Sequence, residues 1–466
     1  MNTTKNTPAM RRIEALVDEN SFVELMSSVT ARATDFNLNA KETPSDGVII
    51  GHGLIDDNLV FVYSQDSTVL GGTIGEMHAR KIKYVYDMAV KLGAPVISII
   101  DSHGVRLQES YDALSALGTI YSSMIEASGV VPEISCIVGE CGGGISLLAS
   151  LSDFSFMTKD ASLYINSPDS IPGNNIDLLD NSKVEFHSEQ SGVVDVVNDE
   201  DEMFERVREL ITLLPGTCDE GYRIDETDDD LNRASDVLGK LDDVDAFLNE
   251  VADDNRFVEV KKDYGKSMIT GFMKLGGTTI GVIGNRNLTE DKGLETTGLK
   301  KAAAFVRFLD AFDIPLLSLT DIKGYERSIE TEKAMPMELA TFASVLSEAD
   351  MPKVNVILNE AFGSAYILMN SKAIGCDLTY AYPDSRMGII EPDKASMILC
   401  PDGSDLDRSE VEDKFYELNS GVTNAARRGF VDKIINPNDT RKYLISGFEL
   451  LYTKREKVGL KKHSSK

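Results

Sequence analysis

The sequence predicts an α/β protein built from two similar halves, in each of which strands alternate with helices. One observation is that residues 79–106 align with residues 299–326 without a gap, at an offset of 220 positions. Each segment reads as an amphipathic helix, a proline-containing loop and an apolar run of strand length. A second observation is that the same offset aligns residues 132–146 with 352–366, apolar run on apolar run. Two blocks in one register point to a tandem duplication rather than to chance similarity.

The aligned blocks match at residues that shape strands and turns. In the first pair, a proline precedes the apolar run and an Asp-x-x-Gly pattern ends it. The identical pairs are Lys81/Lys301, Pro95/Pro315, Ser98/Ser318, Asp101/Asp321 and Gly104/Gly324. Shorter similarities flank these blocks at other offsets, in residues 18–25 against 253–260 and in residues 192–197 against 429–434.

The repeat also indicates where the chain divides. The first copy ends near Asp219 and the second begins near Asp242, so we expect a first domain over residues 1–225 and a second over residues 240–466. Residues 218–245 carry a run of aspartates and glutamates. We expect this segment to be a solvated connector with one short helix.

The composition is that of a globular protein with an acidic surface. The 466 residues carry a formal net charge of −29, and 42% of them are hydrophobic. A charge of this sign argues against nucleic acid as a partner and against attraction to an anionic membrane, because both select basic surfaces. No apolar run approaches the ~20 residues of a membrane span, and no signal peptide is visible at the N-terminus. We therefore expect a soluble, cytoplasmic protein.

The usage of cysteine and histidine argues against metal sites and disulfides. The five cysteines are scattered without a CxxC pair, so neither a zinc ribbon nor a disulfide framework is expected, and the odd count fits a reducing cytosol. His78 has no second ligand at i+3 or i+4. His103 follows a predicted strand and could face a site, but we expect each histidine to have a structural or surface role.

A glycine-rich turn lies where the first half passes from a strand to a helix. The sequence GECGGGIS (139–146) follows the apolar run ISCIV and precedes the helical pattern ISLLASL. Consecutive glycines let the backbone approach a ligand, and amides at a helix N-terminus stabilise an anion, either a phosphate or a developing enolate oxygen. The pattern fits neither a P-loop nor a dinucleotide fingerprint. Taken alone, it could also be a tight turn whose glycines serve packing.

The second half carries a related turn at the matching position. In EAFGSAYILM (360–369), Gly363, Ser364 and Ala365 are the small residues between the strand and the helix. Two such turns in two related halves suggest that each half polarises one carbonyl group. Ser364 lacks the GxSxG context of a nucleophile, and His463, near the end of the chain, is the one histidine of the second half. A Ser-His-Asp hydrolase is therefore disfavoured.

With these residues in view, the chain resembles, over nearly its whole length, the carboxyltransferase subunits of biotin-dependent acyl-CoA carboxylases and decarboxylases. In the first half, the resemblance lies in RRIEALVDENSFVEL, VFVYSQDSTVLGGTIGEMHARKI and APVISIIDSHGVRLQE. In the second half, it lies in AAAFVRFLDAFDIPL, NEAFGSAYILMNSK and RRGFVDKIINPNDTR. The block GGTIGEMHARKI is by itself highly specific to this family.

The resemblance implies an α/β fold of two tandem crotonase-like domains, each a superhelix of ββα units. It implies carboxyl transfer between biotin and the α-carbon of a short-chain acyl-CoA through an enolate, without a metal and without a side-chain base. The first half would bind the acyl-CoA and the second half would bind biotin held by a separate biotin carboxyl carrier protein. Further expected partners are a biotin carboxylase or a membrane decarboxylase subunit, and further copies of the chain in a homo-oligomer, typically a hexamer.

The resemblance also assigns two sets of site residues. The acyl-CoA set, in which the amides of the last two residues hold the thioester carbonyl, is Gly104, Gly142, Gly143 and Gly144. The biotin set, in which the amides of the middle two residues hold the ureido carbonyl, is Gly363, Ser364, Ala365 and Ile367. The expected catalytic residues are therefore Gly143, Gly144, Ser364 and Ala365.

The sequence departs from the family pattern in three places. Residues 102–106 read SHGVR where SGGAR is usual, residues 324–340 lack the usual Gln-Glu pair, and Ile367 stands where aspartate is common at a position associated with acyl-chain choice. No Ala-Met-Lys-Met biotinylation motif occurs, so the biotin carrier must be separate. Three alternatives stay open: the decarboxylase subunit of a sodium-pumping complex, a biotin-independent crotonase-type CoA enzyme that uses Glu140 and Glu360, and a catalytically inactive relative.

Overall fold

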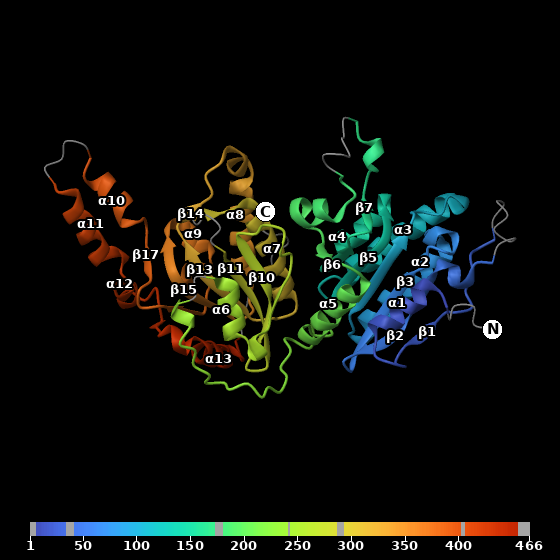
Figure 1. The fold of residues 1–466 in the computed structure, drawn as a ribbon, viewed down its shortest axis with the longest axis horizontal. Coiled ribbons are helices and arrows are strands. Elements are labelled where there is room, and N and C mark those ends of the chain that lie inside the picture. The colour runs from blue at the N-terminus through green and yellow to red at the C-terminus, as the bar shows by residue number, and fades with distance from the viewer. Residues whose placement is uncertain are drawn as a thin grey trace. The chain divides into compact units, whose positions relative to one another are not determined.

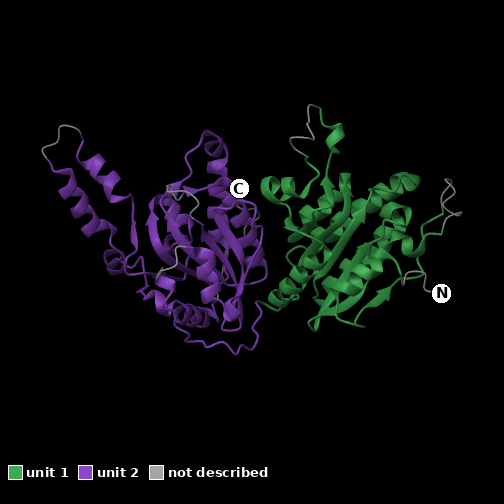
Figure 2. Cartoon of the chain, in the orientation of Figure 1, with its two compact units in different colours: residues 1–221 green, residues 222–466 purple. Residues whose placement is uncertain are grey.

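The structure is a computed structural model and describes residues 6–33, 42–172, 180–240, 243–286, 293–401 and 406–454. The chain divides into two compact units, unit 1 over Met1–Gly221 and unit 2 over Tyr222–Lys466 (Figure 2). Figure 1 shows that each unit is a sheet with helices packed against it. The described residues of each unit form an eight-stranded sheet, and those of unit 2 form an additional two-stranded ribbon.

The sheet of unit 1 begins with antiparallel strands and continues with parallel ones. Its order is β1-β2-β3-β4-β5-β6-β8, and β7 pairs with β5. The strands are β1 (Val23–Leu25), β2 (Val48–Ile55), β3 (Asn58–Gln65), β4 (Val96–Ser102), β5 (Glu133–Gly142), β6 (Phe154–Thr158), β7 (Ser162–Tyr164) and β8 (Asp195–Val197). The longer helices are α1 (Pro8–Leu16), α2 (Glu76–Leu92), α3 (Ser110–Ala127), α4 (Ser146–Leu151) and α5 (Glu200–Leu213). Short helical turns are η2 (Pro44–Gly47), η3 (Leu70–Gly72), η4 (Leu107–Glu109), η5 (Gly143–Ile145), η6 (Pro168–Ser170) and η7 (Phe186–Ser191).

The sheet of unit 2 has the order β9-β10-β11-β13-β15-β16-β18, with β17 paired to β15 and a separate β12–β14 ribbon. Its strands are β9 (Phe257–Glu259), β10 (Met268–Leu275), β11 (Thr278–Asn285), β13 (Leu316–Ile322), β15 (Lys353–Phe362), β16 (Leu378–Ala381), β17 (Arg386–Gly388) and β18 (Lys433–Ile434), and the ribbon is β12 (Gly293–Leu294) with β14 (Gly324–Tyr325). The longer helices are α6 (Val244–Val251), α7 (Thr296–Ala311), α8 (Ile329–Glu348), α9 (Gly363–Leu368), α10 (Pro392–Leu399), α11 (Arg408–Phe415), α12 (Val422–Arg427) and α13 (Thr440–Leu451). Short turns are η8 (Leu238–Lys240), η9 (Asp253–Asn255), η10 (Lys372–Ile374), η11 (Tyr416–Ser420) and η12 (Pro437–Asp439).

The two sheets follow one topology, strand for strand. Even a register irregularity recurs, between Ile100 and Ser102 where β4 meets β5, and between Thr320 and Ile322 where β13 meets β15. These two irregularities are separated by the same 220 positions as the sequence repeat. The predicted α/β class and the tandem duplication are therefore confirmed.

The matched segments fold alike because each places an apolar strand under an amphipathic helix. In β4, the side chains from Val96 to Ile100 are buried, as expected for a central strand of a parallel sheet that is covered on both faces. Helix α2 turns a buried stripe that includes Ile82, Val85 and Ala89 toward the sheet, at the i, i+3, i+7 spacing of one helix face. Each such fully buried branched side chain contributes roughly 1.5–3 kcal/mol to folding.

The lysine that the two copies share is also buried in both. Lys81 donates hydrogen bonds from Nζ to the carbonyl oxygen of Ser45 (3.0 Å) and to that of Val48 (2.5 Å), and burial lowers its pKa to about 8. Lys301 lies 4.0 Å from a carboxylate oxygen of Glu259. The shared lysine therefore ties helix α2 in unit 1, and helix α7 in unit 2, to a neighbouring polar group of the same unit.

The acidic segment between the copies is largely exposed over residues 222–239, as expected of a solvated connector, and has the short turn η8 near its end. It is nevertheless attached to unit 2: the amide of Asp225 donates to the carbonyl of Gly277 (2.9 Å), and its carboxylate pairs with Lys274 (2.7 Å). Asp229 pairs with Arg233 (3.0 Å) within the segment. The segment therefore lies along unit 2 and is not a free linker.

Two further features concern the helices. Helices α10 and α11 pack against each other and extend away from the sheet of unit 2 (Figure 1), whereas α12 packs against the strands β17 and β18. Within the described ranges, no helix combines the length and the apolar character that crossing a membrane requires.

Candidate functional site

The predicted turn of unit 1 lies where β5 passes through η5 into α4. Gly142 is extended (φ −110°, ψ 152°), whereas Gly143 has φ +65°, a conformation that favours glycine. A Cβ added at Gly143 would meet no atom within 4 Å, and Gly144 is exposed. The backbone in front of this turn therefore faces open space that a ligand can enter.

The turn of unit 2, where β15 enters α9, has nearly the same backbone. Phe362 is extended (φ −116°, ψ 146°) and Gly363 has φ +67°. A Cβ added at Gly363 would meet the carbonyl oxygen of Ile389 at 3.7 Å, an ordinary contact. Ser364 is exposed and Ala365 is buried. The two turns are therefore conformational equivalents, as the repeat register predicts.

Each turn begins a helical segment, so its first amides lack an acceptor within that segment. The first amides of a helical turn have no acceptor within the helix, because the residues that would accept from them precede it. In unit 1 these amides belong to Gly143 and Gly144, and in unit 2 to Gly363, Ser364 and Ala365. Two such N–H groups that point at one oxygen stabilise negative charge on it.

Side chains from neighbouring elements hold the first turn in place. The hydroxyl of Tyr121, on α3, donates to the carbonyl oxygen of Gly144, and the hydroxyl of Ser146 donates to that of Gly143 (2.7 Å). Both bonds engage carbonyl groups, so they fix the peptide planes without occupying the amides.

The aspartates of the two Asp-x-x-Gly patterns have supporting roles. The amide of Asp101 donates to Gln65 Oε1 (3.3 Å), and the amide of Asp321 donates to Asn285 Oδ1 (3.2 Å), one residue pair being the counterpart of the other at the offset of 220. The Asp101 carboxylate accepts from Arg12 (3.0 Å). These contacts tie neighbouring strands together at the edge of the sheet where the turns lie.

The second turn has a cluster of charges behind it. Glu360, buried on β15 just before the turn, pairs with Arg386 (2.5 Å) and with Lys323 (3.3 Å). Lys323 also lies 3.8 Å from Glu391. In front, the hydroxyl of Tyr325 and that of Ser364 are hydrogen-bonded at 2.7 Å. The sequence did not single out Lys323, Arg386 or Tyr325, because their contacts depend on the register of strands far apart in the chain.

The structure places the predicted residues in two groups, one per unit. In unit 1, Gly104 follows β4, the strand beside β5, with φ +116° and no atom within 4 Å of an added Cβ, so it opens the same edge of the sheet as Gly142, Gly143 and Gly144. In unit 2, Gly363, Ser364, Ala365 and Ile367 share helix α9. Ile367 is 40% exposed, one helical turn after Gly363.

A buried ion cluster stands below the first turn and was not predicted. The guanidinium of Arg106 lies 2.6 Å from Asp46 and 2.8 Å from Glu109, and all three side chains are fully buried. Glu109 in turn accepts from the amide of Glu76 (2.7 Å) at the start of α2. Burial raises the pKa of Asp46 to about 6, although the charge of Arg106 opposes the shift. The cluster fixes the loop after Gly104 against α2.

His78 has the structural role and His103 the surface position that the sequence predicts. His78 is fully buried between the side chain of Gln65 (3.2 Å) and the carbonyl of Asp46 (3.0 Å), and burial lowers its pKa to about 3. His103 is exposed. His463 lies outside the described residues. Along the described stretches, His, Cys, Asp and Glu side chains do not gather in threes as metal ligands would.

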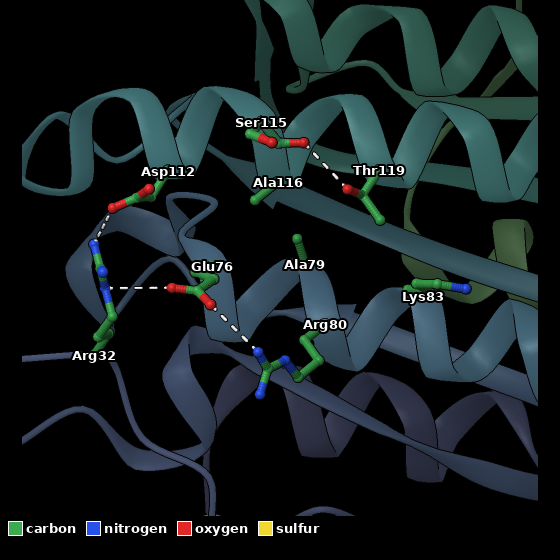
Figure 3. Close-up of a pocket in the computed structure, with 9 residues that line it drawn as sticks. All are labelled: Arg32, Glu76, Ala79, Arg80, Lys83, Asp112, Ser115, Ala116 and Thr119. Atoms are coloured by element: carbon green, nitrogen blue, oxygen red, sulfur yellow. Dashed lines mark hydrogen bonds and ion pairs between the residues drawn. The ribbon is translucent and has the colours of Figure 1, made fainter.

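Unit 1 also has a polar cavity of about 460 Å³ between α2 and α3 (Figure 3). Arg32 reaches over one end of it and pairs with Glu76 (3.3 Å) and with Asp112, while Arg80 pairs with Glu76 from the other side (3.3 Å). The lining residues are Arg32, Glu76, Ala79, Arg80, Lys83, Asp112, Ser115, Ala116 and Thr119. None of the turn residues lines this cavity, and its cations are already paired, so the turns and not the cavity carry the candidate chemistry.

Comparison with known proteins gives one consistent family. The model of the carboxyl transferase domain matches residues 3–465. The propionyl-CoA carboxylase beta chain of Roseobacter denitrificans is 36% identical, over 98% of this chain and 93% of the relative. The methylmalonyl-CoA decarboxylase subunit alpha of Veillonella parvula is 35% identical, over 98% of this chain and 92% of the relative.

A solved structure of high similarity is a transcarboxylase 12S described as a hexamer assembly with hydrolysed methylmalonyl-coenzyme A bound. It has a TM-score of 0.92 and 31% sequence identity, over 98% of this chain and 91% of that one. A single-chain, multi-domain long-chain acyl-CoA carboxylase, at 22% identity and a TM-score of 0.80, shares the fold over 94% of this chain and 46% of its own.

Proposed function

Because the chain belongs to the carboxyl transferase domain family, we propose that it moves a carboxyl group between biotin on a separate carrier and the α-carbon of a short-chain acyl-CoA. Family membership makes it a biotin-dependent carboxyltransferase, and the crotonase-like α/β fold predicted for its two halves is confirmed. The observation that carries the proposal is the pair of turns, one per unit, that present amides in the same backbone conformation.

The turn of unit 1 is the proposed site for the acyl-CoA. The amides of Gly143 and Gly144 donate to the thioester oxygen, which gains negative charge as the α-proton leaves and an enolate forms. One such donor contributes roughly 2.7–4 kcal/mol to the stabilisation of a developing oxyanion in comparable sites. Gly104 keeps the approach to the turn free of a side chain, whereas Gly142 packs against the ring of Tyr164, which an added Cβ would meet at 2.6 Å.

The turn of unit 2 is the proposed site for biotin. Its residues fit a urea carbonyl, because an added Cβ at Gly363 would meet one atom at 3.7 Å and the amides of Ser364 and Ala365 stand at the start of α9. When bound, biotin supplies the urea nitrogen that carries the carboxyl group and accepts the α-proton. The chain holds the urea oxygen with these two amides, and Ile367 lies next to them as part of the same set.

The proposal assigns the proton transfer to the substrates, and the carboxylates nearest the turns support this. Both carboxylate oxygens of Glu360 are engaged in ion pairs, with Arg386 (2.5 Å) and with Lys323 (3.3 Å), and do not face a substrate unpaired. Glu140, its counterpart in unit 1, lies 3.4 Å from the hydroxyl of Tyr164. A biotin-independent crotonase-type reaction would instead need one of these glutamates as an acid or base.

The relatives support a substrate class without fixing the direction of transfer. One carries the name of a propionyl-CoA carboxylase subunit and another that of a methylmalonyl-CoA decarboxylase subunit, at 36% and 35% identity. A structural neighbour holds methylmalonyl-coenzyme A. We therefore place propionyl-, acetyl- and methylmalonyl-type thioesters among the substrates, and we keep decarboxylation within a sodium-pumping complex as the second function.

The proposed setting is a cytoplasmic homo-oligomer, a hexamer by analogy with the hexamer assembly of the similar transcarboxylase 12S. Its partners would be a biotin carboxyl carrier protein and either a biotin carboxylase or a membrane decarboxylase subunit. The relatives are named as subunits of a propionyl-CoA carboxylase and of a methylmalonyl-CoA decarboxylase.

The test is exchange of ¹⁴C between a panel of carboxylated acyl-CoAs and free biotin or a biotinyl carrier protein. The purified chain should exchange label with at least one short-chain carboxyacyl-CoA. Absence of exchange with every member of the panel, from a folded protein and with both biotin forms, would overturn the proposed function.

Gly143→Ala tests the turn itself. The added methyl group meets no atom within 4 Å, so the fold should survive, but it costs about 1–2 kcal/mol at positive φ and enters the space before the amides. Exchange should fall about 100–1000-fold, the loss expected when one oxyanion donor is displaced. Gly118→Ala, on the exposed face of α3 and equally free of contacts, is the matched control and should keep full activity. Unchanged exchange by Gly143→Ala would remove this turn from the site.

A further inference from the structure

The two turns share their backbone but not their hydroxyl groups. In unit 2, the hydroxyl oxygens of Tyr325 and Ser364 lie 2.7 Å apart, and Ser364 is the second residue of α9. The positions that match them in unit 1 at the offset of 220 are Val105 and Gly144, which have no hydroxyl. The hydroxyl pair is therefore an addition to the second turn alone.

The frame that positions Tyr325 is common to both units. Tyr325 pairs with Leu294 in the β12–β14 ribbon, and the amide of Glu326 donates to the carbonyl of Leu294 (2.9 Å). In unit 1, Val105 forms the matching parallel bridge with Ile74, and the amide of Arg106 donates to the carbonyl of Ile74 (2.9 Å). The same backbone frame thus carries a phenol in one unit and an isopropyl group in the other. What differs between the two turns is side-chain chemistry.

The two hydroxyl groups together have one proton available to donate to a ligand. Each hydroxyl has one proton, and one bond joins the two oxygens, so one of the two protons remains for another acceptor. Ser364 is exposed at the start of α9, beside its own amide and that of Ala365. If the Tyr325 hydroxyl donates to Ser364 Oγ, the serine proton is directed away from Tyr325, and a hydroxyl that accepts one bond becomes a better donor of the next.

We propose that the Ser364 hydroxyl, oriented by Tyr325, is a third hydrogen-bond donor of the unit 2 turn and selects a ligand whose carbonyl oxygen accepts more than two hydrogen bonds, such as a cyclic urea. The inference deepens the proposed function, on which it rests. A urea oxygen carries more negative charge than a thioester oxygen because two nitrogens donate electron density to it. A site with an extra donor therefore suits the urea. The turn of unit 1 suits the thioester, because its nearby hydroxyls, those of Tyr121 and Ser146, already donate to backbone carbonyls and leave the amides as its donors.

In this assignment Ser364 contacts the ligand and Tyr325 is a positioning residue. The losses in biotin binding and in kcat caused by the two substitutions should therefore differ in size, and they should not be additive. Ser364→Ala removes the donor, whereas Tyr325→Phe leaves the serine hydroxyl present but free to rotate. The double variant should lose no more than Ser364→Ala alone, because the tyrosine acts only through the serine.

The experiment uses the full-length chain and has a binding readout besides activity. Titration calorimetry measures the dissociation constants of free D-biotin and of the acyl-CoA, and ¹⁴C exchange gives kcat and KM for each substrate. For Ser364→Ala we expect the biotin dissociation constant to rise about 5–10-fold. We expect kcat to fall about 100–1000-fold, by analogy with the loss of a side-chain oxyanion donor. For Tyr325→Phe we expect a loss of about 3–10-fold in kcat. The acyl-CoA dissociation constant should stay within about twofold of the wild type in both, because the assigned acyl-CoA site lies in unit 1.

Two further variants separate this role from a structural one. Ser364→Thr restores a hydroxyl at the same position and should recover most of the activity lost in Ser364→Ala. Tyr84→Phe removes an exposed phenol from α2 and serves as the matched control for Tyr325→Phe, with parameters equal to the wild type. Melting temperatures of all variants establish that the fold is retained.

The outcomes separate the two proposals. A wild-type chain that exchanges label, together with a Ser364→Ala variant whose biotin binding and kcat are unchanged, overturns the hydroxyl assignment and leaves the proposed function standing. Additive losses in the double variant overturn the positioning role of Tyr325. A folded wild-type chain that exchanges no label with any carboxyacyl-CoA overturns the proposed function and this inference with it.

Discussion

Replacing Glu133 by glutamine is expected to stabilise unit 1, and by much more at pH 8 than at pH 5. Glu133 is the first residue of β5 and is 1% exposed. Burial raises the pKa of its carboxyl group from 4.5 to about 9; the charge of Asp153 adds to this shift, and a hydrogen bond with Tyr86 partly offsets it. Glutamine has nearly the same shape and never ionises.

The direction in which stability changes with pH follows from the protonation states of Glu133 in the folded and unfolded chain. Between pH 4.5 and about 9, the folded chain keeps the Glu133 proton whereas the unfolded chain releases it, so stability falls as pH rises through this window. Each pH unit within the window changes the stability by ~1.4 kcal/mol. From pH 5 to pH 8 the wild type should therefore lose on the order of 4 kcal/mol relative to Glu133→Gln, which does not titrate there.

Unit 2 provides an internal comparison. The residue that matches Glu133 at the offset of 220 is Lys353, whose Nζ donates to the carbonyls of Leu346 (2.8 Å) and Ala349 (2.7 Å) near the end of α8. A cation at carbonyls of a helix C-terminus is well placed, because the helix dipole is negative there. The pH-dependent loss should thus be confined to unit 1.

Hydrogen exchange read by mass spectrometry can resolve the two units. The chain has no tryptophan, so ordinary fluorescence offers little, whereas peptides from β5 and β15 report on each unit separately. Glu205→Gln, on the exposed face of α5, is the control and should change opening free energies equally little at both pH values. A Glu133→Gln variant stabilised equally at pH 5 and pH 8, or destabilised at pH 8, would refute the reasoning.

Two further substitutions test other parts of the chain. Ile367→Asp should change the preference among acyl-CoAs, measured as the ratio of kcat/KM for propionyl-CoA to that for acetyl-CoA. An identical ratio would show that Ile367 does not influence the choice of acyl chain. Arg106→Met should lower stability by about 3–5 kcal/mol, because it leaves the carboxylates of Asp46 and Glu109 buried without their cation. Thermal melting measures this, with Arg80→Met, on the partly exposed face of α2, as the control, and equal melting temperatures for the two variants would contradict the role given to the cluster.

The positions of the two turns could be predicted from the sequence, because the repeat allowed local patterns in the two halves to be compared. An apolar run that ends in small residues predicts a strand-to-helix turn in either half, and the match of Gly143 with Gly363 predicts that both turns share one conformation. The φ values of +65° and +67° agree with that prediction. The information needed lay within a few residues of each turn.

The contacts around the turns could not be predicted in the same way. Tyr325 meets Ser364 across 39 residues of sequence, and Arg106 meets Asp46 only after β2 and β4 take their places in one sheet. Such pairs depend on strand register, which no local pattern encodes. The attachment of the acidic segment to unit 2 was not predicted for the same reason, because Lys274, which pairs with Asp225, stands about fifty residues further along the chain.

The use of backbone amides at both turns has a consequence for how this protein can evolve. A peptide N–H is supplied by every residue except proline, so mutation of the neighbouring side chains leaves the anchoring groups in place. The two turns already read Gly-Gly-Gly and Phe-Gly-Ser across equivalent positions, although their conformations coincide. After a gene duplication, each copy would thus have kept backbone amides able to bind a carbonyl group. The surrounding side chains could then change to suit different substrates while these amides stayed in place.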